Sequence, residues 1–183
     1  MKDVLIIGDS ISIGYTPIVQ KLLTDSARVA RINENGGPTS NGVEKIDLWL
    51  GATAWHVVHF NFGLHDIKLM PPDGKHQVPL DRYQANLRHI VARLKRTPAK
   101  LIFATTTPAP LGKLSPPRNP PDVLDYNVAA RAIMAEEGVA LNDLFSLALP
   151  QLTEIQQKEN VHFTAAGYQK LGEQVAAAIR RHL

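Results

Sequence analysis

Hydrophobic and polar residues alternate along the chain in two ways, which predict strands and helices in turn. Short apolar runs, typical of strands buried in a parallel sheet, occur at residues 4–7, 27–32, 56–62, 100–104 and 139–141. Apolar side chains spaced three or four residues apart, typical of helices, occur near residues 18–23, 41–50, 81–96, 122–137, 144–157 and 164–180. Strand and helix are therefore predicted to alternate from end to end.

This alternation predicts the fold class. Strand–helix–strand units form parallel sheets, and their right-handed crossovers place helices on both faces. We therefore expect an α/β protein, a three-layer α/β/α sandwich around a central five-stranded parallel sheet. The length fits one domain over residues 1–183. Proline-rich loops at residues 68–79 and 105–121 leave the carboxyl ends of two strands, where this architecture places its ligands.

The composition limits the classes of function. With 20 Lys+Arg against 17 Asp+Glu, the net charge is only +3. The basic residues are scattered and are interpreted as solvated helix faces, Arg31 among them, so nucleic-acid binding is not expected. The absence of cysteine excludes disulfides, thiolate zinc sites and a cysteine nucleophile. No apolar run approaches the ~20 residues that cross a bilayer.

The first predicted strand begins almost at Met1, without a signal peptide ahead of it. A cytoplasmic protein is therefore expected, with a trimmed exported protein as the alternative.

Polar clusters follow three of the predicted strands, and a fourth cluster precedes the last helix. They are Gly8-Asp9-Ser10, Asn35-Gly36-Gly37, Gly63-Leu64-His65-Asp66 and Glu159-Asn160-Val161-His162. The carboxyl ends of parallel strands meet at one edge of the sheet, and a loop ahead of the last helix can reach that edge. We therefore expect the four clusters to form one site.

The residue types in these clusters suit ester hydrolysis by a serine. This chemistry needs a hydroxyl, a base, a group that orients the base, and N–H donors for the oxyanion. Ser10 can supply the hydroxyl and His162 the base, because imidazole titrates near neutral pH. Glu159 lies close enough in sequence to orient that ring. Gly37 lets a backbone N–H approach a substrate oxygen, and His65 can add a side-chain N–H.

The four clusters, in this order, resemble the SGNH hydrolases, also called GDSL esterases and lipases. The resemblance covers nearly the whole chain and implies a flavodoxin-like fold. It also implies that Ser10 is the nucleophile and His162 the base. The backbone N–H groups of Ser10 and Gly37 would form two thirds of the oxyanion hole.

Two clusters depart from the pattern of that family. The third normally reads Gly-x-Asn-Asp, with the asparagine amide as an oxyanion donor, and His65 stands at the asparagine position. The histidine cluster normally carries aspartate three residues before the base, and Glu159 stands there. Glu159 is predicted to complete a triad. The alternative is a Ser10–His162 dyad oriented by a backbone carbonyl.

Other polar and aromatic residues near these clusters are interpreted as structural. The acidic ones are expected to shape turns or cap helices, the strand histidines to support the strands, and the aromatic ones to pack. This group comprises Asp9, Ser12, His56, His59, Asp66, Trp49, Trp55 and Phe163. The histidine spacing predicts no metal site.

We therefore predict a serine esterase that hydrolyses short-acyl esters through an acyl-enzyme on Ser10. The proline-rich loops carry few large apolar residues, which favours short acyl groups such as O-acetyl groups on carbohydrates. The alternatives are a non-catalytic carbohydrate- or ligand-binding module, and a thioesterase or lysophospholipase. A flavin or nucleotide binder is disfavoured by the lack of a glycine-rich phosphate loop. The expected partner is a small-molecule or saccharide ester, without cofactor or metal; oligomeric state is left open.

Overall fold

The computed structural model describes residues 1–183. Its central sheet has five strands, all paired in parallel, in the order β2-β1-β3-β6-β7. The strands are β1 (Lys2–Ile7), β2 (Ala27–Arg31), β3 (Val57–Phe60), β6 (Lys100–Ala104) and β7 (Ala140–Asn142). The predicted five-stranded parallel sheet is confirmed.

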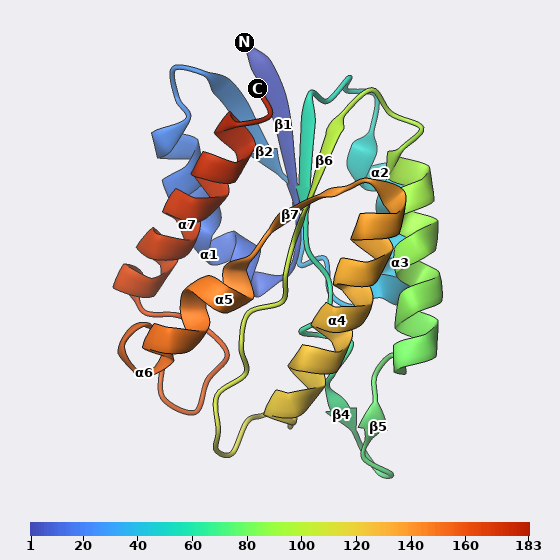
Figure 1. Ribbon diagram of the computed structural model, residues 1–183, viewed down its shortest axis with the longest axis vertical. Coiled ribbons are helices and arrows are strands. Elements are labelled where there is room, and N and C mark those ends of the chain that lie inside the picture. Colours follow the sequence, from blue (N-terminus) through green and yellow to red (C-terminus); the bar gives the residue numbers. More distant parts are fainter.

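Helices cover both faces of the sheet (Figure 1). One layer contains α1 (Ser10–Leu22) and α7 (Ala165–Arg180), and the other contains α2 (Thr39–Leu50), α3 (Leu80–Leu94) and α4 (Pro120–Glu137). The short α5 (Leu144–Ala148), η1 (Leu149–Gln151) and α6 (Leu152–Ile155) connect β7 to α7. The predicted α/β/α sandwich is therefore confirmed. Both termini lie at one end of the molecule, and the strands run toward the other end (Figure 1).

The strand residues are buried because helices cover the sheet on both sides. Val4 to Ile7 of β1 and all four residues of β3 are buried. Unbroken apolar runs are what such doubly covered strands require. Phe60 of β3 and Phe103 of β6 pack edge to face in this core, with ring centroids 5.3 Å apart.

Two glycines allow α1 and α7 to approach closely. A Cβ on Gly14 would lie 2.1 Å from a ring carbon of Tyr168, and one on Gly172 would lie 2.7 Å from Ile18. Larger residues at these positions would therefore push the helices apart. Because α1 begins at Ser10 and α7 begins just after His162, this packing determines how the two helix starts face each other.

The first proline-rich loop contains a hairpin that the sequence did not predict. It consists of β4 (Leu69–Met70) and β5 (Lys75–His76) and lies at the lower end of the molecule (Figure 1). His76 Nε2 lies 2.7 Å from Asp122 Oδ2, which ties the hairpin to α4. The helical pattern was predicted to begin near residue 122, but α4 begins at Pro120, with two prolines at its first positions, as proline's fixed φ favours.

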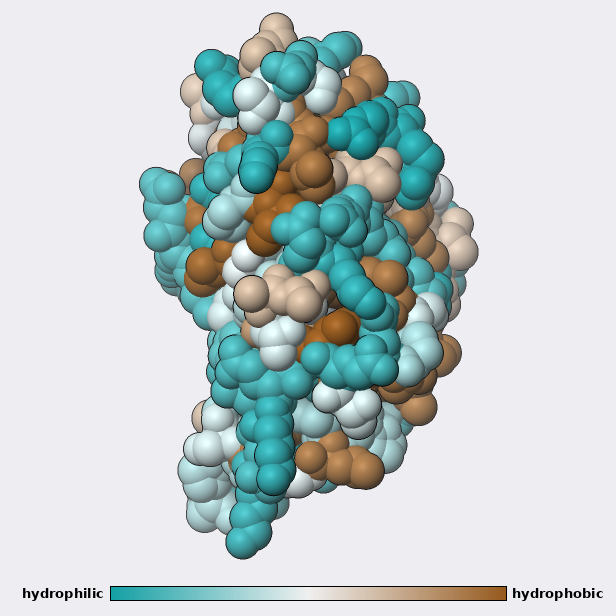
Figure 2. All heavy atoms as spheres, turned by 90° about the vertical axis from the view of Figure 1, so that its left-hand side faces the viewer, coloured by the Kyte–Doolittle hydropathy of each residue, from teal (hydrophilic) through white to brown (hydrophobic).

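Figure 2 shows the side of the molecule formed by α1 and α7. Hydrophilic residues cover much of this surface, and hydrophobic residues lie scattered among them. None of the helices combines the length and the hydrophobicity needed to span a bilayer.

Candidate active site

Ser10 is the first residue of α1 and follows the carboxyl end of β1. Asp9 precedes it in an extended conformation, and its Oδ1 accepts a hydrogen bond from the N–H of Ile11 at 2.9 Å. Asp9 therefore caps the helix, as predicted. The N–H groups of the first helical turn have no acceptor within the helix, so the Ser10 N–H is a donor at the positive end of the helix dipole.

His162 lies in the loop before α7, with its ring against Ser10. Its Nε2 is 2.8 Å from Ser10 Oγ, and its Nδ1 is 2.7 Å from Asn160 Oδ1. The same Asn160 oxygen accepts the backbone N–H of His162 at 3.0 Å. An amide oxygen can only accept, so the proton of the neutral ring lies on Nδ1 and Nε2 accepts from Ser10. The structure thus brings the expected nucleophile and base together.

Glu159 makes no hydrogen bond with His162, which differs from the expected Ser-His-Glu arrangement. Its backbone has φ 50°, the one left-handed non-glycine residue of the chain. Its side chain lies against Gly112, where Glu159 Oε1 would be 3.3 Å from a Cβ. Asn160 takes its place because an Asx turn brings that side chain back onto the residue two positions ahead.

Gly37 lies in the loop between β2 and α2 with φ 64°, a conformation that favours glycine. A Cβ here would lie 2.6 Å from Asn41 Nδ2. The Gly37 N–H donates to Asn35 Oδ1 at 3.0 Å. The position therefore requires glycine, but its N–H is already hydrogen-bonded, unlike the free donor expected from the sequence.

His65 lies near Ser10, and Lys68 determines which nitrogen of the His65 ring carries the proton. Lys68 Nζ lies 2.8 Å from His65 Nδ1. An ammonium group can only donate, so Nδ1 is the acceptor and Nε2 carries the proton. Burial, followed by the charges of Lys68, Arg118 and His162, lowers the pKa of His65 to about 4, so the ring is neutral near pH 7. Nε2 has no partner in the protein and is not sealed from solvent.

Asp66 joins the loops that carry His65 and Gly37. Its Oδ1 accepts the backbone N–H of Thr39 at 2.9 Å and the Thr39 hydroxyl at 2.5 Å. Thr39 is the first residue of α2, so Asp66 caps that helix from a distant loop, in line with the capping role expected for it. Burial raises the pKa of this carboxyl to about 7.

Ser10, His65 and His162 line a cleft of about 510 Å³, the size of many small-molecule sites. Only Leu64, Leu114 and Val161 supply hydrophobic lining. The other residues of the lining are Ser10, Asn35, His65, Lys68, Lys113, Ser115, Pro116, Arg118, Glu159, Asn160 and His162. No group of three His, Asp or Glu side chains gathers here or elsewhere in a way that would hold a metal ion.

Comparison with known proteins identifies the family of this chain. The sequence model of the GDSL-like lipase/acylhydrolase family matches residues 6–170. The chain belongs to this family. It is therefore a carboxylic ester hydrolase, as predicted. No curated protein sequence matches the chain.

Solved structures of similar fold include a lipase/acylhydrolase from Enterococcus faecalis, with a TM-score of 0.87 and 21% identity over 100% of this chain and 97% of the other. An acetylxylan esterase from Geobacillus stearothermophilus has a TM-score of 0.81 and 22% identity over 97% of this chain and 94% of the other. The acetyl xylan esterase AlAXEase has a TM-score of 0.79 and 18% identity over 97% and 99%. At these identities the likeness shows the fold.

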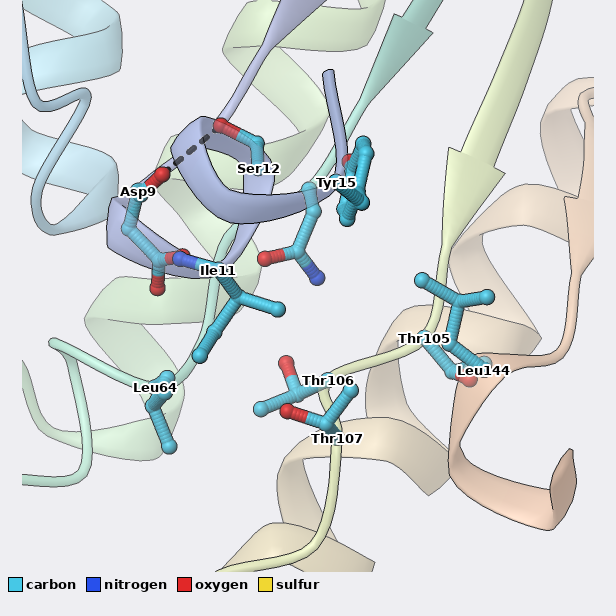
Figure 3. A pocket seen from close by; sticks show the side chains of 10 residues that line it. Asp9, Ile11, Ser12, Tyr15, Leu64, Thr105, Thr106, Thr107 and Leu144 are labelled. Carbon is cyan, nitrogen blue, oxygen red and sulfur yellow. Dashed lines mark hydrogen bonds between the residues drawn. The ribbon is translucent and has the colours of Figure 1, made fainter. Parts of the chain in front are cut away.

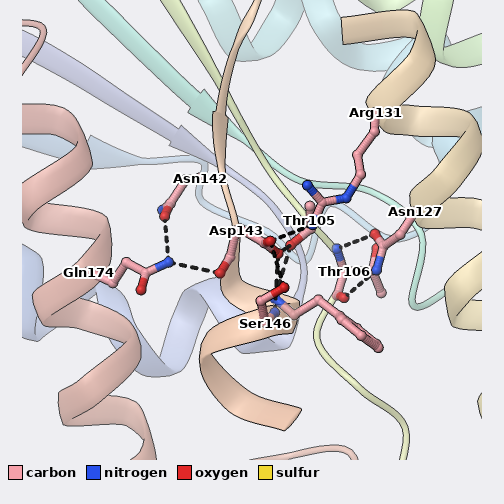
Figure 4. Close-up of polar contacts among 9 residues, drawn as sticks. Thr105, Thr106, Asn127, Arg131, Asn142, Asp143, Ser146 and Gln174 are labelled. Carbon is pink, nitrogen blue, oxygen red and sulfur yellow. Dashed lines mark hydrogen bonds and ion pairs between the residues drawn. The ribbon is translucent and has the colours of Figure 1, made fainter. Parts of the chain in front are cut away.

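In this GDSL-like acylhydrolase, the segment after β6 forms the wall behind the first turn of α1. Figure 3 shows a small cavity between that turn and Thr105–Thr107, with Leu64 and Leu144 at its sides. Asn127 holds Thr106 by both backbone groups, accepting its N–H at 2.8 Å and donating to its carbonyl at 2.9 Å (Figure 4). The wall is therefore fixed by the adjacent α4.

Asp143 fixes the same wall from the side of β7 (Figure 4). It accepts the Thr105 hydroxyl at 2.9 Å and forms an ion pair with Arg131 at 2.5 Å. Burial opposes ionisation of this carboxyl, but hydrogen bonds from Ser146, Arg131 and Thr105 outweigh it and lower its pKa to about 2. Its charge therefore persists over the working range of an esterase.

Arg31 of this acylhydrolase does not lie on a solvated helix face, which corrects the sequence interpretation. It ends β2, and its guanidinium donates to the carbonyls of Gly8 and Glu34 at 3.0 Å and 2.9 Å, and to Ser12 Oγ at 3.0 Å. Carbonyls at the ends of two adjacent strands need donors, and a guanidinium offers five in a fixed fork. Arg31 therefore joins the Ser10 loop to the loop that carries Gly37.

The strand histidines and the aromatic residues of this acylhydrolase have the structural roles expected for them. His59 is fully buried and its Nε2 lies 3.1 Å from Asn142 Nδ2, while His56 Nδ1 accepts the Asp3 N–H at 2.9 Å. Phe163, next to the base, is buried in the core. Trp49 is buried as well and donates to Glu34.

Sequence reasoning missed three residues that shape the site. Asn160 could have been found from its position two residues before the base, a typical Asx-turn spacing. Lys68 lies three residues after His65, close enough to contact it on one turn. Arg118 lies near the end of the irregular loop between β6 and α4, and no local pattern marks it.

Proposed function

We propose that this protein is a serine esterase that acts through an acyl-enzyme. The Ser10 Oγ attacks the ester carbonyl carbon while its proton passes to His162 Nε2. The protonated ring then gives this proton to the departing alkoxide, and a water activated by the same ring hydrolyses the acyl-enzyme. The contact of 2.8 Å between Ser10 Oγ and His162 Nε2 carries the proposal.

The oxyanion is stabilised by two donors that have no competing acceptor. One is the Ser10 N–H at the start of α1, and the other is the Nε2–H of His65. A neutral imidazole with its proton on Nε2 can do what the amide of an asparagine does. The Gly37 N–H becomes a third donor when Asn35 turns away from it.

Asn160 is proposed as the group that orients the base. It holds the ring in the tautomer that accepts from Ser10, and its neutral amide provides less stabilisation of the imidazolium than a carboxylate would. Glu159 then contributes to the rim of the cleft and not to proton transfer.

Replacing Asn160 by aspartate tests this assignment. A carboxylate beside Nδ1 favours the imidazolium, so the base loses its proton at higher pH and the acid limb of the kcat/KM profile moves upward. We expect an upward shift of about one pH unit in Asn160→Asp. The measurement is a pH profile of 4-nitrophenyl acetate hydrolysis for the wild type and the variant.

Glu159→Gln is the matched control, because it changes the neighbouring residue without touching the ring. Its acid limb should stay in place and its kcat should remain within about threefold of the wild type, as expected for an exposed side chain. The opposite pattern, a large loss in Glu159→Gln and no shift in Asn160→Asp, would restore Glu159 as the third member of a triad.

The acyl group is proposed to be short, such as an acetyl group on a saccharide. The cleft is polar, with three hydrophobic residues among its lining, so a long acyl chain would find little apolar surface to cover it. Two structures of similar fold are described as acetyl xylan esterases, which supports the same class of substrate.

A chain-length series of 4-nitrophenyl esters tests the acyl specificity. We expect kcat/KM to be highest for acetate and to fall by about tenfold or more at octanoate, because each added methylene gains little burial and crowds polar walls. Acetylated xylo-oligosaccharides assayed for acetate release test the alcohol side. A maximum at octanoate or longer would favour the lysophospholipase or lipase alternative.

A further inference from the structure

The cleft beside Ser10 carries more positive than negative charge. Lys68, Lys113 and Arg118 line it, and Glu159 is the one carboxylate in its lining. None of the three cations takes part in any of the eight ion pairs of the chain. In proteins generally, a buried or half-buried basic side chain has an acidic partner.

Arg118 is the best-defined of these groups. The residue is only 8% exposed, and its guanidinium donates from Nε to the Leu64 carbonyl at 2.7 Å and from Nη1 to the Pro116 carbonyl at 3.1 Å. Nη2 has no partner in the protein and is not sealed from solvent. The two backbone bonds therefore hold a buried guanidinium in place with one face free toward the cleft.

Lys68 and Lys113 add charge on either side of this guanidinium. The Lys68 ammonium is half-buried, and its one hydrogen-bond partner is the neutral His65 ring. The charges of Asp9 and Asp66 act on it, but neither forms an ion pair with it. Lys113 is exposed at the rim. Asp9 is the carboxylate whose charge acts on Arg118, but it makes no hydrogen bond to that residue. The cleft thus holds a fixed guanidinium and two ammonium groups, none of which forms an ion pair.

We infer that the esters this enzyme prefers carry an anionic group, a carboxylate or a phosphate, which Arg118 binds within the Ser10 cleft. A guanidinium with free N–H groups is suited to such oxyanions, because its planar fork matches their geometry. Lys68 and Lys113 strengthen the field that attracts the anion. This inference rests on the proposed esterase function and specifies the substrate class of the same site.

Matched pairs of esters test the inference. For the alcohol side, 4-acetoxybenzoate and 4-acetoxyphenyl phosphate are each compared with methyl 4-acetoxybenzoate. For the acyl side, 4-nitrophenyl hydrogen glutarate is compared with 4-nitrophenyl methyl glutarate. In the wild type at low salt, we expect kcat/KM for at least one anionic ester to exceed that of its neutral partner by about 10-fold to 100-fold.

Arg118→Gln should reduce that ratio to about one, because the charge-assisted hydrogen bonds are lost. The ratio is compared within each variant, so a general loss of activity in Arg118→Gln does not affect it. Lys113→Gln, an exposed change that leaves the loop anchors intact, should reduce the ratio by about threefold. Lys100→Gln removes the same charge from the amino end of β6, at the opposite edge of the sheet, and should leave the ratio unchanged.

The possible outcomes separate this inference from the proposed function. Equal kcat/KM for anionic and neutral esters in the wild type, or a preference that persists in Arg118→Gln, would overturn the anion site and leave the esterase assignment standing. A wild type that hydrolyses none of these esters would overturn the esterase assignment itself. A preference in the benzoate or phosphate comparison would place the anionic group on the alcohol side of the ester, and a preference in the glutarate comparison would place it on the acyl side. The difference between the benzoate and the phosphate results shows which of the two anions is bound better.

Discussion

Ser10→Ala is expected to lower kcat for 4-nitrophenyl acetate by about 10⁴-fold to 10⁶-fold, the loss typical of removing a serine nucleophile. No other hydroxyl contacts His162 Nε2, so nothing replaces the lost group. His162→Ala should cause a loss of similar size, and the double variant should be little worse than either single one, because the two residues act as a unit. Steady-state rates of the three variants measure this.

Ser40→Ala is the matched control for this prediction. Ser40 is exposed on α2 and makes no hydrogen bond through its side chain, so its loss should leave kcat unchanged. A fluorophosphonate should label the wild-type protein on the peptide that contains Ser10, as read by mass spectrometry. Full activity in Ser10→Ala would contradict the mechanism, and a wild type that neither turns over esters nor labels would favour a non-catalytic binding module.

The strands and the three-layer fold could be predicted from the sequence because their signals are local. The run from Val4 to Ile7 must be buried on both faces, and alternation with helices leaves a parallel sheet as the arrangement that does so. That Ser10 and His162 lie together could be predicted from this topology, because it brings the end of β1 and the loop before α7 to one edge of the sheet.

The sequence analysis expected Glu159 as the partner of His162, and the structure has Asn160 there instead, in the left-handed turn formed at Glu159. Sequence spacing places Glu159 and Asn160 equally near the ring. The φ of 50° at Glu159 directs one side chain toward Gly112 and lets the other turn back onto the ring. A left-handed glutamate has no distinctive local signal, since this conformation is uncommon outside glycine and asparagine.

The roles of Arg31 and Arg118 could not be predicted from the sequence for a different reason. Their roles come from contacts with carbonyl groups that are distant in sequence, such as the Gly8 carbonyl for Arg31 and the Leu64 carbonyl for Arg118. A scattered basic residue is normally solvated. Only the folded loops show that these two guanidinium groups supply donors to chain segments that the sheet leaves unpaired.

His65→Ala is expected to lower kcat by about 10²-fold to 10³-fold, the loss typical of one oxyanion donor. KM should change little, because the donor acts on charge that develops only in the transition state. The burial and nearby charges that keep the pKa of His65 at about 4 leave the ring neutral throughout the pH range in which His162 is a base. The loss should therefore be equally large across that range, which the pH profile of the variant measures.

Two further variants separate a donor from a residue that only supports the loop. His65→Asn restores an amide N–H at the same position and should recover most of the activity that His65→Ala loses. Lys68→Met removes the cation that keeps the proton on Nε2, so part of the population carries it on Nδ1 and kcat falls by about tenfold with KM little changed. If His65→Asn were as inactive as His65→Ala, or if both raised KM at constant kcat, His65 would be a substrate-binding residue, and the Ser10 N–H and Gly37 would form the oxyanion site without it.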